Sequence, residues 1–177
     1  HHALETVSGL KRGHSAARET AKRMPVPAQY IAAIRHHVRP VVRAMLRVQM
    51  LTGVRSESIC YAVPEQFDTS GDMWLWRPKH KTERLGKELI VPIGPRCQRV
   101  LRPYLEAAKP GQFLFSPRSV SANRRYNKHY ETQSYCTAVV RGIRKANRTR
   151  KPEDCIPHWT PHQIRHLKGT TINDEYG

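Results

Sequence analysis

Near the end of the chain, seven consecutive residues combine a helix start with two side chains suited to an anion. They read Thr160-Pro161-His162-Gln163-Ile164-Arg165-His166. Threonine is a favoured N-cap and proline fits the first helical position, so His162 and Arg165 fall in the first turn, three residues apart on one face. The unpaired N–H groups and the dipole of a helix start favour a phosphate there. The segment therefore predicts a site for a phosphate-bearing ligand.

A second arginine stands where an apolar helix breaks. The run Leu51-Thr52-Gly53-Val54-Arg55 ends the helix at its glycine, and the arginine follows after one residue. A guanidinium makes bidentate phosphate contacts that an ammonium cannot. A single arginine is usually a solvated surface charge. The interpretation of Arg55 as functional therefore depends on its position after the turn and on its partnership with His162 and Arg165.

A basic hairpin supplies a third group. Lys79-His80-Lys81-Thr82 lies between two runs typical of strands. Basic hairpin tips are commonly solvated, so Lys79 and Lys87 remain alternatives to Lys81 as a functional lysine.

Composition narrows the class of partner. The chain has 177 residues, 38% of them hydrophobic, which suits one main domain. Its 31 Lys and Arg against 14 Asp and Glu give a formal charge of +17. This predicts a polyanionic partner, with double-stranded DNA first, whereas no apolar run has the length of a membrane span.

The dispersed cysteines indicate reduced thiols in a cytoplasmic protein; they are Cys60, Cys97, Cys136 and Cys155. The pair His1-His2 is either native or a tag remnant.

The elements that must position these groups are mostly helical. The expected helices are 28–38, 41–51, 55–61, a helix opened by Pro95, 132–148 and one running from Pro161 towards Gly177. Met73–Arg77 and Glu88–Ile93 read as strands, after a turn that follows Phe67. The order predicts an α+β, mainly helical domain with a small antiparallel three-stranded sheet.

A metal site is the main competing interpretation of the histidines. Cys155, His158, His162 and His166 form a possible ligand set, with the last two at the spacing of helical zinc ligands. Position 163 is glutamine where a metallopeptidase has a glutamate, and the prolines at 157 and 161 prevent one continuous helix. We therefore expect no metal.

The two arginine motifs and the hairpin lysine together resemble the tyrosine recombinases, the phage-integrase family, over residues 27–177. The resemblance implies cleavage and rejoining of DNA through a 3′-phosphotyrosyl intermediate, with no metal or nucleotide cofactor. Arg55 and Arg165 would hold the phosphate oxygens, Lys81 would protonate the leaving 5′-oxygen, and His162 would assist proton transfer or bind the phosphate. It further implies site-specific recombination or integration, in a homo-oligomer assembled on DNA and often encoded by a mobile element.

Three features depart from the family pattern. Ser58 stands at the position that is usually acidic, with Glu57 just before it. In the family, the third His or Trp and the nucleophilic tyrosine follow a further helix, whereas this sequence stops at Gly177. Tyr176 lies only about three turns beyond Arg165 on the expected helix, so it is not assigned as the nucleophile. We expect residues 28–177 to be a catalytic domain lacking its C-terminal tail, which binds DNA without cleaving it. Residues 1–27 would be the end of an N-terminal core-binding region with a basic linker.

Further cations are expected to contact the DNA backbone. They lie on one helix and in the polar loop before it, and they are Arg141, Arg144, Lys145 and Arg148, with Arg124 and Arg125 in the loop. Type IB topoisomerases share the implied chemistry, but the small size favours a recombinase. The alternative from another class is a non-catalytic DNA-binding module related to integrases.

Overall fold

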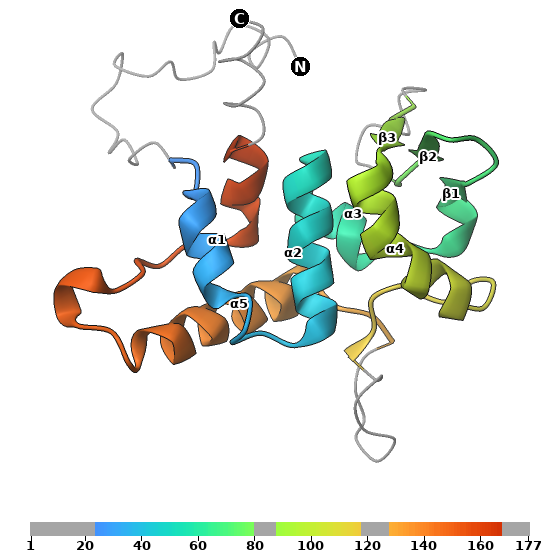
Figure 1. Cartoon of the computed structure of the whole chain (residues 1–177). Coiled ribbons are helices and arrows are strands. Elements are labelled where there is room, and N and C mark those ends of the chain that lie inside the picture. Colours follow the sequence, from blue (N-terminus) through green and yellow to red (C-terminus); the bar gives the residue numbers. More distant parts are fainter. Residues whose placement is uncertain (1–23, 80–87, 118–127, 168–177) are drawn as a thin grey trace, which may run out of the picture.

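Helix α2 (Pro40–Thr52) runs through the middle of the molecule and supplies a large part of its core (Figure 1). The computed structural model describes residues 24–79, 88–117 and 128–167. Proline at the first position fits a helix start, and Val41, Met45 and Val48 are buried along one side, as the sequence pattern predicts. Leu51, in the last turn of the helix, is 36% exposed.

Helices α3 (Ser56–Cys60) and α5 (Thr132–Asn147) pack against α2, and α1 (Ala28–Ile34) packs against α5. The prediction that the first helix reaches Val38 is wrong, because the chain turns after Ile34, where the His37 N–H bonds to the Ile34 carbonyl. Helices α1 and α5 meet at Gly142. A Cβ there would come within 2.5 Å of the Val38 Cγ1 atom, so only glycine allows this approach.

A small antiparallel sheet lies at one side, in the order β1 (Phe67–Asp68), β2 (Trp74–Trp76), β3 (Val91–Ile93). Trp74 faces Ile93 and Trp76 faces Val91, and all four side chains are buried. The strands are shorter than predicted because Met73 and Ile90, at the ends of the predicted runs, are exposed. The predicted α+β class with three antiparallel strands is confirmed.

Helix α4 (Pro95–Ala107) follows β3 and packs against α2. Cys97 and Leu101 face the core, while arginines occupy the outer side. Two short 3-10 helices, η2 (Pro64–Gln66) and η5 (Pro152–Asp154), complete the connections. Residues 161–167 form the last described helix, which stands beside α1 and near the end of α2 in Figure 1. No helix within the described ranges has the length and apolarity needed to cross a membrane.

Candidate functional site

The helix at residues 161–167 begins as its sequence predicts and presents its polar residues outward. The Thr160 N–H donates to the Gln163 side-chain Oε1 at 3.0 Å, which satisfies a backbone group of the helix start. Ile164 is fully buried, whereas His162 and Arg165 are exposed. Burial of one side of the helix therefore holds the histidine and the arginine at the surface.

The turn after α2 places Arg55 at the surface in a similar way. Gly53 has a φ of 68°, a left-handed conformation that glycine adopts without strain, and its N–H bonds to the Gln49 carbonyl at 2.8 Å. Val54 and Ser56 are buried while Arg55 between them is exposed. The predicted helix end at Gly53 is confirmed.

One hydrogen bond joins these two segments. The Arg165 guanidinium donates from Nη1 to the Gly53 carbonyl at 3.3 Å. The two residues are 112 positions apart in sequence, and Gly53 is two residues before Arg55. The fold thus brings the helix that carries His162 and Arg165 to the end of α2 from which Arg55 extends.

A buried amide network fixes the Arg55 segment from beneath. Gln49 is fully buried, and its Nε2 donates to the Val54 carbonyl at 3.2 Å and to the Ser56 hydroxyl at 3.1 Å. The Tyr135 hydroxyl on α5 donates to Gln49 Oε1 at 3.1 Å. Burial raises the pKa of Tyr135 well above its usual value, so the hydroxyl keeps its proton.

Sequence reasoning missed this network. The available signal was a glutamine on the apolar stripe of a helix, four residues after Met45, where a polar side chain requires partners. Its bonds to residues 54 and 56 hold the backbone on both sides of Arg55. Gln49 is therefore a positioning residue for that arginine.

Some of the other predicted site residues lie within the described ranges and some lie outside them. Lys81, Arg124 and Arg125 lie outside the described residues, as does Tyr176. Lys79 is described and exposed. The predicted DNA-contacting cations on α5 and at its C-cap are all exposed; they are Arg141, Arg144 and Lys145 on the helix and Arg148 at the cap.

Ser58, at the position that is usually acidic in tyrosine recombinases, differs from Glu57 in its exposure to solvent. Ser58 is buried within α3, whereas Glu57 is exposed. The carboxylate of this helix therefore points to solvent, and the residue three positions after Arg55 is a buried hydroxyl. The side chain that hydrogen-bonds to the residues on both sides of Arg55 is Gln49.

The described residues do not form a metal site. The rings of His162 and His166 are in edge contact, with centroids 5.1 Å apart, but no group of three or more possible ligands is gathered in the described ranges. Two of the cysteines are also poor nucleophiles, because burial raises the pKa of the Cys60 thiol and of the Cys97 thiol to about 12. Those two thiols stay protonated at neutral pH.

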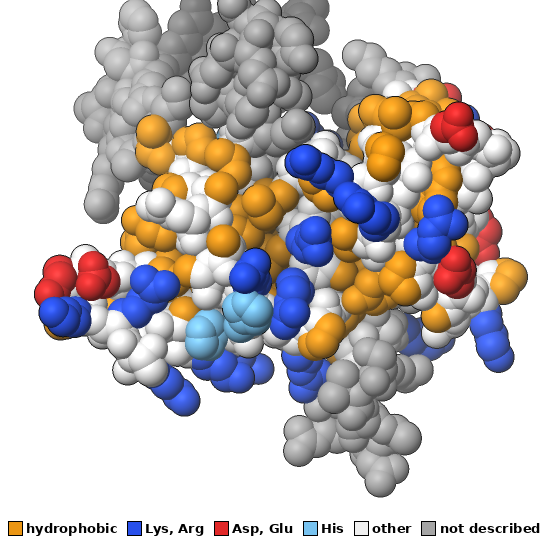
Figure 2. Space-filling model, in the orientation of Figure 1, with side chains coloured by type: hydrophobic (Ala, Val, Ile, Leu, Met, Phe, Trp, Pro, Cys, Tyr) orange, Lys and Arg blue, Asp and Glu red, His pale blue; other side chains and the backbone are white. Residues whose placement is uncertain are grey.

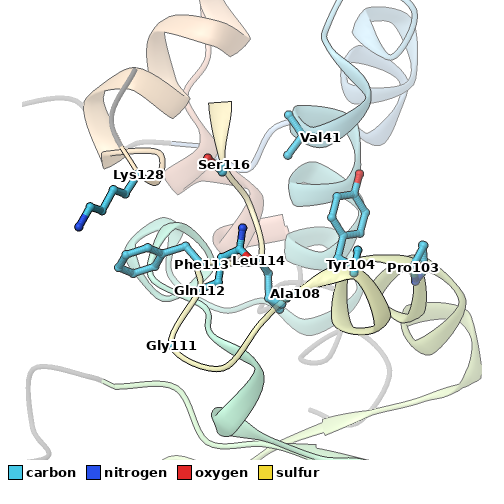
Figure 3. Close-up of a pocket in the computed structure, with 11 residues that line it drawn as sticks. Val41, Pro103, Tyr104, Ala108, Gly111, Gln112, Phe113, Leu114, Ser116 and Lys128 are labelled. Carbon is cyan, nitrogen blue, oxygen red and sulfur yellow. The ribbon is translucent and has the colours of Figure 1, made fainter. Parts of the chain in front are cut away.

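A cavity of about 780 Å³ lies elsewhere, between α4 and the 108–116 segment. Figure 3 shows mostly apolar side chains around it, with Gln112 and Lys128 at its edge. Neither of the arginines at the end of α2 lines it. The cavity lacks the paired acid and base groups that would suggest a second reaction centre, so the candidate site remains at the Arg55 and Arg165 segments.

Comparison with known proteins gives matches in structure alone. No protein-family model matches the sequence, and no curated protein matches it. The Tn1549 transposon integrase, solved in complex with circular intermediate DNA, superposes with a TM-score of 0.66 at 17% identity, covering 89% of this chain and 56% of that one.

Two further structures agree with that match. The XerA recombinase gives a TM-score of 0.57 at 22% identity, covering 88% of this chain and 53% of its own. A lambda integrase dimer bound to a COC′ core site gives 0.62 at 17% identity, covering 92% and 44%. The chain therefore spans about half the length of these structures. The resemblance that the arginine motifs predict is confirmed at the level of architecture: this chain has the fold of the tyrosine recombinases and integrases.

Proposed function

We propose that this chain is the DNA-binding and phosphate-activating part of a tyrosine recombinase, which cuts and rejoins double-stranded DNA through a 3′-phosphotyrosyl intermediate. The observation that carries the proposal is the bond between Arg165 and the Gly53 carbonyl, because it places two arginine-bearing segments from distant parts of the sequence at one end of α2. The shared fold with integrases solved on DNA supports it. The net charge of +17 supports a polyanionic substrate.

In this proposal each residue has a role suited to its chemistry. Arg55 and Arg165 are permanent cations that bind the non-bridging oxygens and stabilise charge developing in the transition state. His162, in the first turn of a helix, assists proton transfer or donates a hydrogen bond to the phosphate. Lys81 is the general acid towards the 5′-oxygen, and no metal or nucleotide is needed.

The proposed function also assigns roles to the two ends of the protein. Residues 28–177 would be the catalytic domain and residues 1–27 the end of an N-terminal region with its basic linker. The nucleophilic tyrosine would lie beyond Gly177. This chain alone should accordingly form no SDS-stable adduct with a suicide DNA substrate, whereas the complete natural polypeptide should form one. An adduct from this chain that is lost on Tyr176→Phe would identify Tyr176 as the nucleophile instead.

DNA binding is tested first by its response to salt. If the chain neutralises about six phosphates, the logarithm of affinity should fall against the logarithm of salt with a slope of about −5. Fluorescence anisotropy with a labelled duplex, titrated from low to physiological ionic strength, measures this slope. A salt-independent affinity would remove the nucleic-acid interpretation.

Cleavage is tested in the complete natural polypeptide by single-turnover rates at saturating protein, which exclude binding losses. Arg165→Ala and Arg55→Ala should each lower the rate by about 10²–10³, the usual loss for one preorganised charge donor. Arg118→Ala is the control, since Arg118 has no proposed role, and should leave the rate nearly unchanged. If the three variants behave alike, the alternative of a non-catalytic DNA-binding module replaces the recombinase.

A further inference from the structure

A groove between α2 and α4 is lined by four arginines. The two helices pack antiparallel, with Arg43 and Arg47 on one wall and Arg96 and Arg99 on the other. The groove holds about 350 Å³, and Tyr104 lines the end near the start of α2. We call it the arginine groove. Figure 2 shows Lys and Arg side chains gathered on this face over α2 and α4, with carboxylates towards the two sides.

The four groove arginines are not paired with acidic side chains in the described part of the chain. Arg77, by contrast, forms an ion pair with Glu88, its Nε lying 3.0 Å from the carboxylate Oε1. None of the four groove arginines forms an ion pair with any residue in the described ranges, and no carboxylate lines the groove. The Nε atom of Arg43 is buried without a hydrogen-bond partner among the described residues. Four like charges around one hollow repel one another unless an anion enters.

The groove chemistry suits phosphate in particular. Guanidinium groups bind phosphate oxygens in pairs, and rows from two helices present several such groups side by side. Arg43 and Arg47 are about 6 Å apart along the helix axis, since each residue rises about 1.5 Å. Each strand of duplex DNA carries one phosphate per about 3.4 Å of its axis, so two arginines about 6 Å apart can contact separate phosphates of one strand.

The groove is distinct from the candidate cleavage site. Arg43 lies nine residues before Thr52, about 13 Å along α2, whereas Arg55 and the Arg165 contact lie past the other end of that helix. No groove-lining residue belongs to the Arg55 or Arg165 segments. A ligand in the groove is therefore additional to a phosphate held by those two arginines.

We propose that the arginine groove binds the sugar-phosphate backbone of duplex DNA at a distance from the cleavage site. This inference rests on the proposed function, because it assigns a second contact surface to the same substrate. The shared chemistry is a phosphate ester, and a free polyphosphate is the other source of it.

The experiment compares two double variants that remove the same charge. Arg47→Gln with Arg99→Gln empties the exposed rim of the groove. Arg35→Gln with Arg102→Gln is the control, because Arg35 lies outside the groove and Arg102 stacks on the Trp74 ring at 5.0 Å. Circular dichroism establishes that each variant is folded. Arg47→Lys with Arg99→Lys keeps the charge and tests whether charge suffices.

The readout is the salt slope of duplex binding by this chain. The groove variant should reduce the magnitude of the slope by about 2 and weaken binding about tenfold at low salt, whereas the control should change the slope by less than about 0.5. The lysine variant should retain the wild-type slope. Equal slopes for groove and control variants would overturn the groove proposal while leaving the proposed function intact. A flat wild-type slope would instead overturn the proposed function.

A second arm separates the two phosphate sources. Tripolyphosphate is added to the chain alone, and the thermal midpoint is followed for the wild type and the groove variant. If the groove binds phosphate esters, tripolyphosphate should raise the thermal midpoint of the wild type more than that of the groove variant. If it raises the midpoint only when the groove is intact while the DNA slope is the same for groove and control variants, the groove takes free polyphosphate and the DNA assignment is wrong.

Discussion

The two ends of α2 carry buried polar groups that differ in whether they have hydrogen-bond partners. Near its end, Gln49 is fully buried and has a partner for its carbonyl oxygen and for its amide group. Near its start, Arg43 has a buried Nε without a partner in the described part of the chain and three other arginines around it. A satisfied buried group fixes geometry, because breaking it costs free energy, whereas an unsatisfied cation has free energy to gain from a ligand. The start of α2 therefore leaves a buried donor unsatisfied, whereas its end holds a satisfied amide that fixes the segment after the helix.

The strongest way to break this comparison is to remove the amide. Gln49→Leu leaves the Val54 carbonyl, the Ser56 hydroxyl and the Tyr135 hydroxyl without their partner, and each buried unsatisfied group costs about 1–3 kcal/mol. We expect the free energy of unfolding to fall by about 3 kcal/mol, measured by urea denaturation.

Gln133→Leu on α5 is the matched control, because Gln133 is exposed. It should change the free energy of unfolding by no more than about 0.5 kcal/mol. If the two leucine variants lose the same stability, the network holds nothing in place.

A smaller effect comes from removing one donor. Tyr135→Phe deletes the hydroxyl bound to Gln49 Oε1 and should cost about 1 kcal/mol in the free energy of unfolding. In the Gln49→Leu background the same change should cost nothing, since the hydroxyl already lacks a partner there. A double-mutant cycle measures this coupling, and additive losses would show that the two side chains act independently.

The smallest expected effect is in the arginine groove. Arg43→Met keeps a long apolar stem and removes a cation whose buried Nε has no partner in the described ranges. At low salt the free energy of unfolding, measured by urea denaturation, should therefore stay within about 0.5 kcal/mol of the wild type or rise. A loss above about 1 kcal/mol would show that Arg43 stabilises the fold. The contrast with Gln49 would then disappear.

Local rules predicted much of this molecule. Gly53 as a helix end, Pro95 and Pro161 as helix starts, and a strand within Met73–Arg77 are decided within a few residues of sequence, and all are confirmed. The arrangement of the candidate site could be predicted only in part from the sequence. The spacing of His162 and Arg165 predicts one face, but their meeting with the Arg55 segment depends on how distant helices pack.

What sequence reasoning missed shares one physical cause. Gln49 finds partners on three separate elements, and the arginine groove combines a spacing of four on α2 with a spacing of three on α4. Either row alone is an ordinary solvated helix face. Only their packing shows that the rows share one hollow, and no local pattern specifies which helix lies opposite another.

The Gln163 side chain links the first turn of the helix at 161–167 to a distant part of the chain. Its Oε1 accepts from the Thr160 N–H and its Nε2 donates to the Met24 carbonyl at 3.0 Å, so one amide group joins positions 139 residues apart. The same helix is attached to Gly53 through Arg165. The helix at 161–167 is therefore hydrogen-bonded both to the segment that precedes α1 and to the turn that follows α2, so its position depends on both.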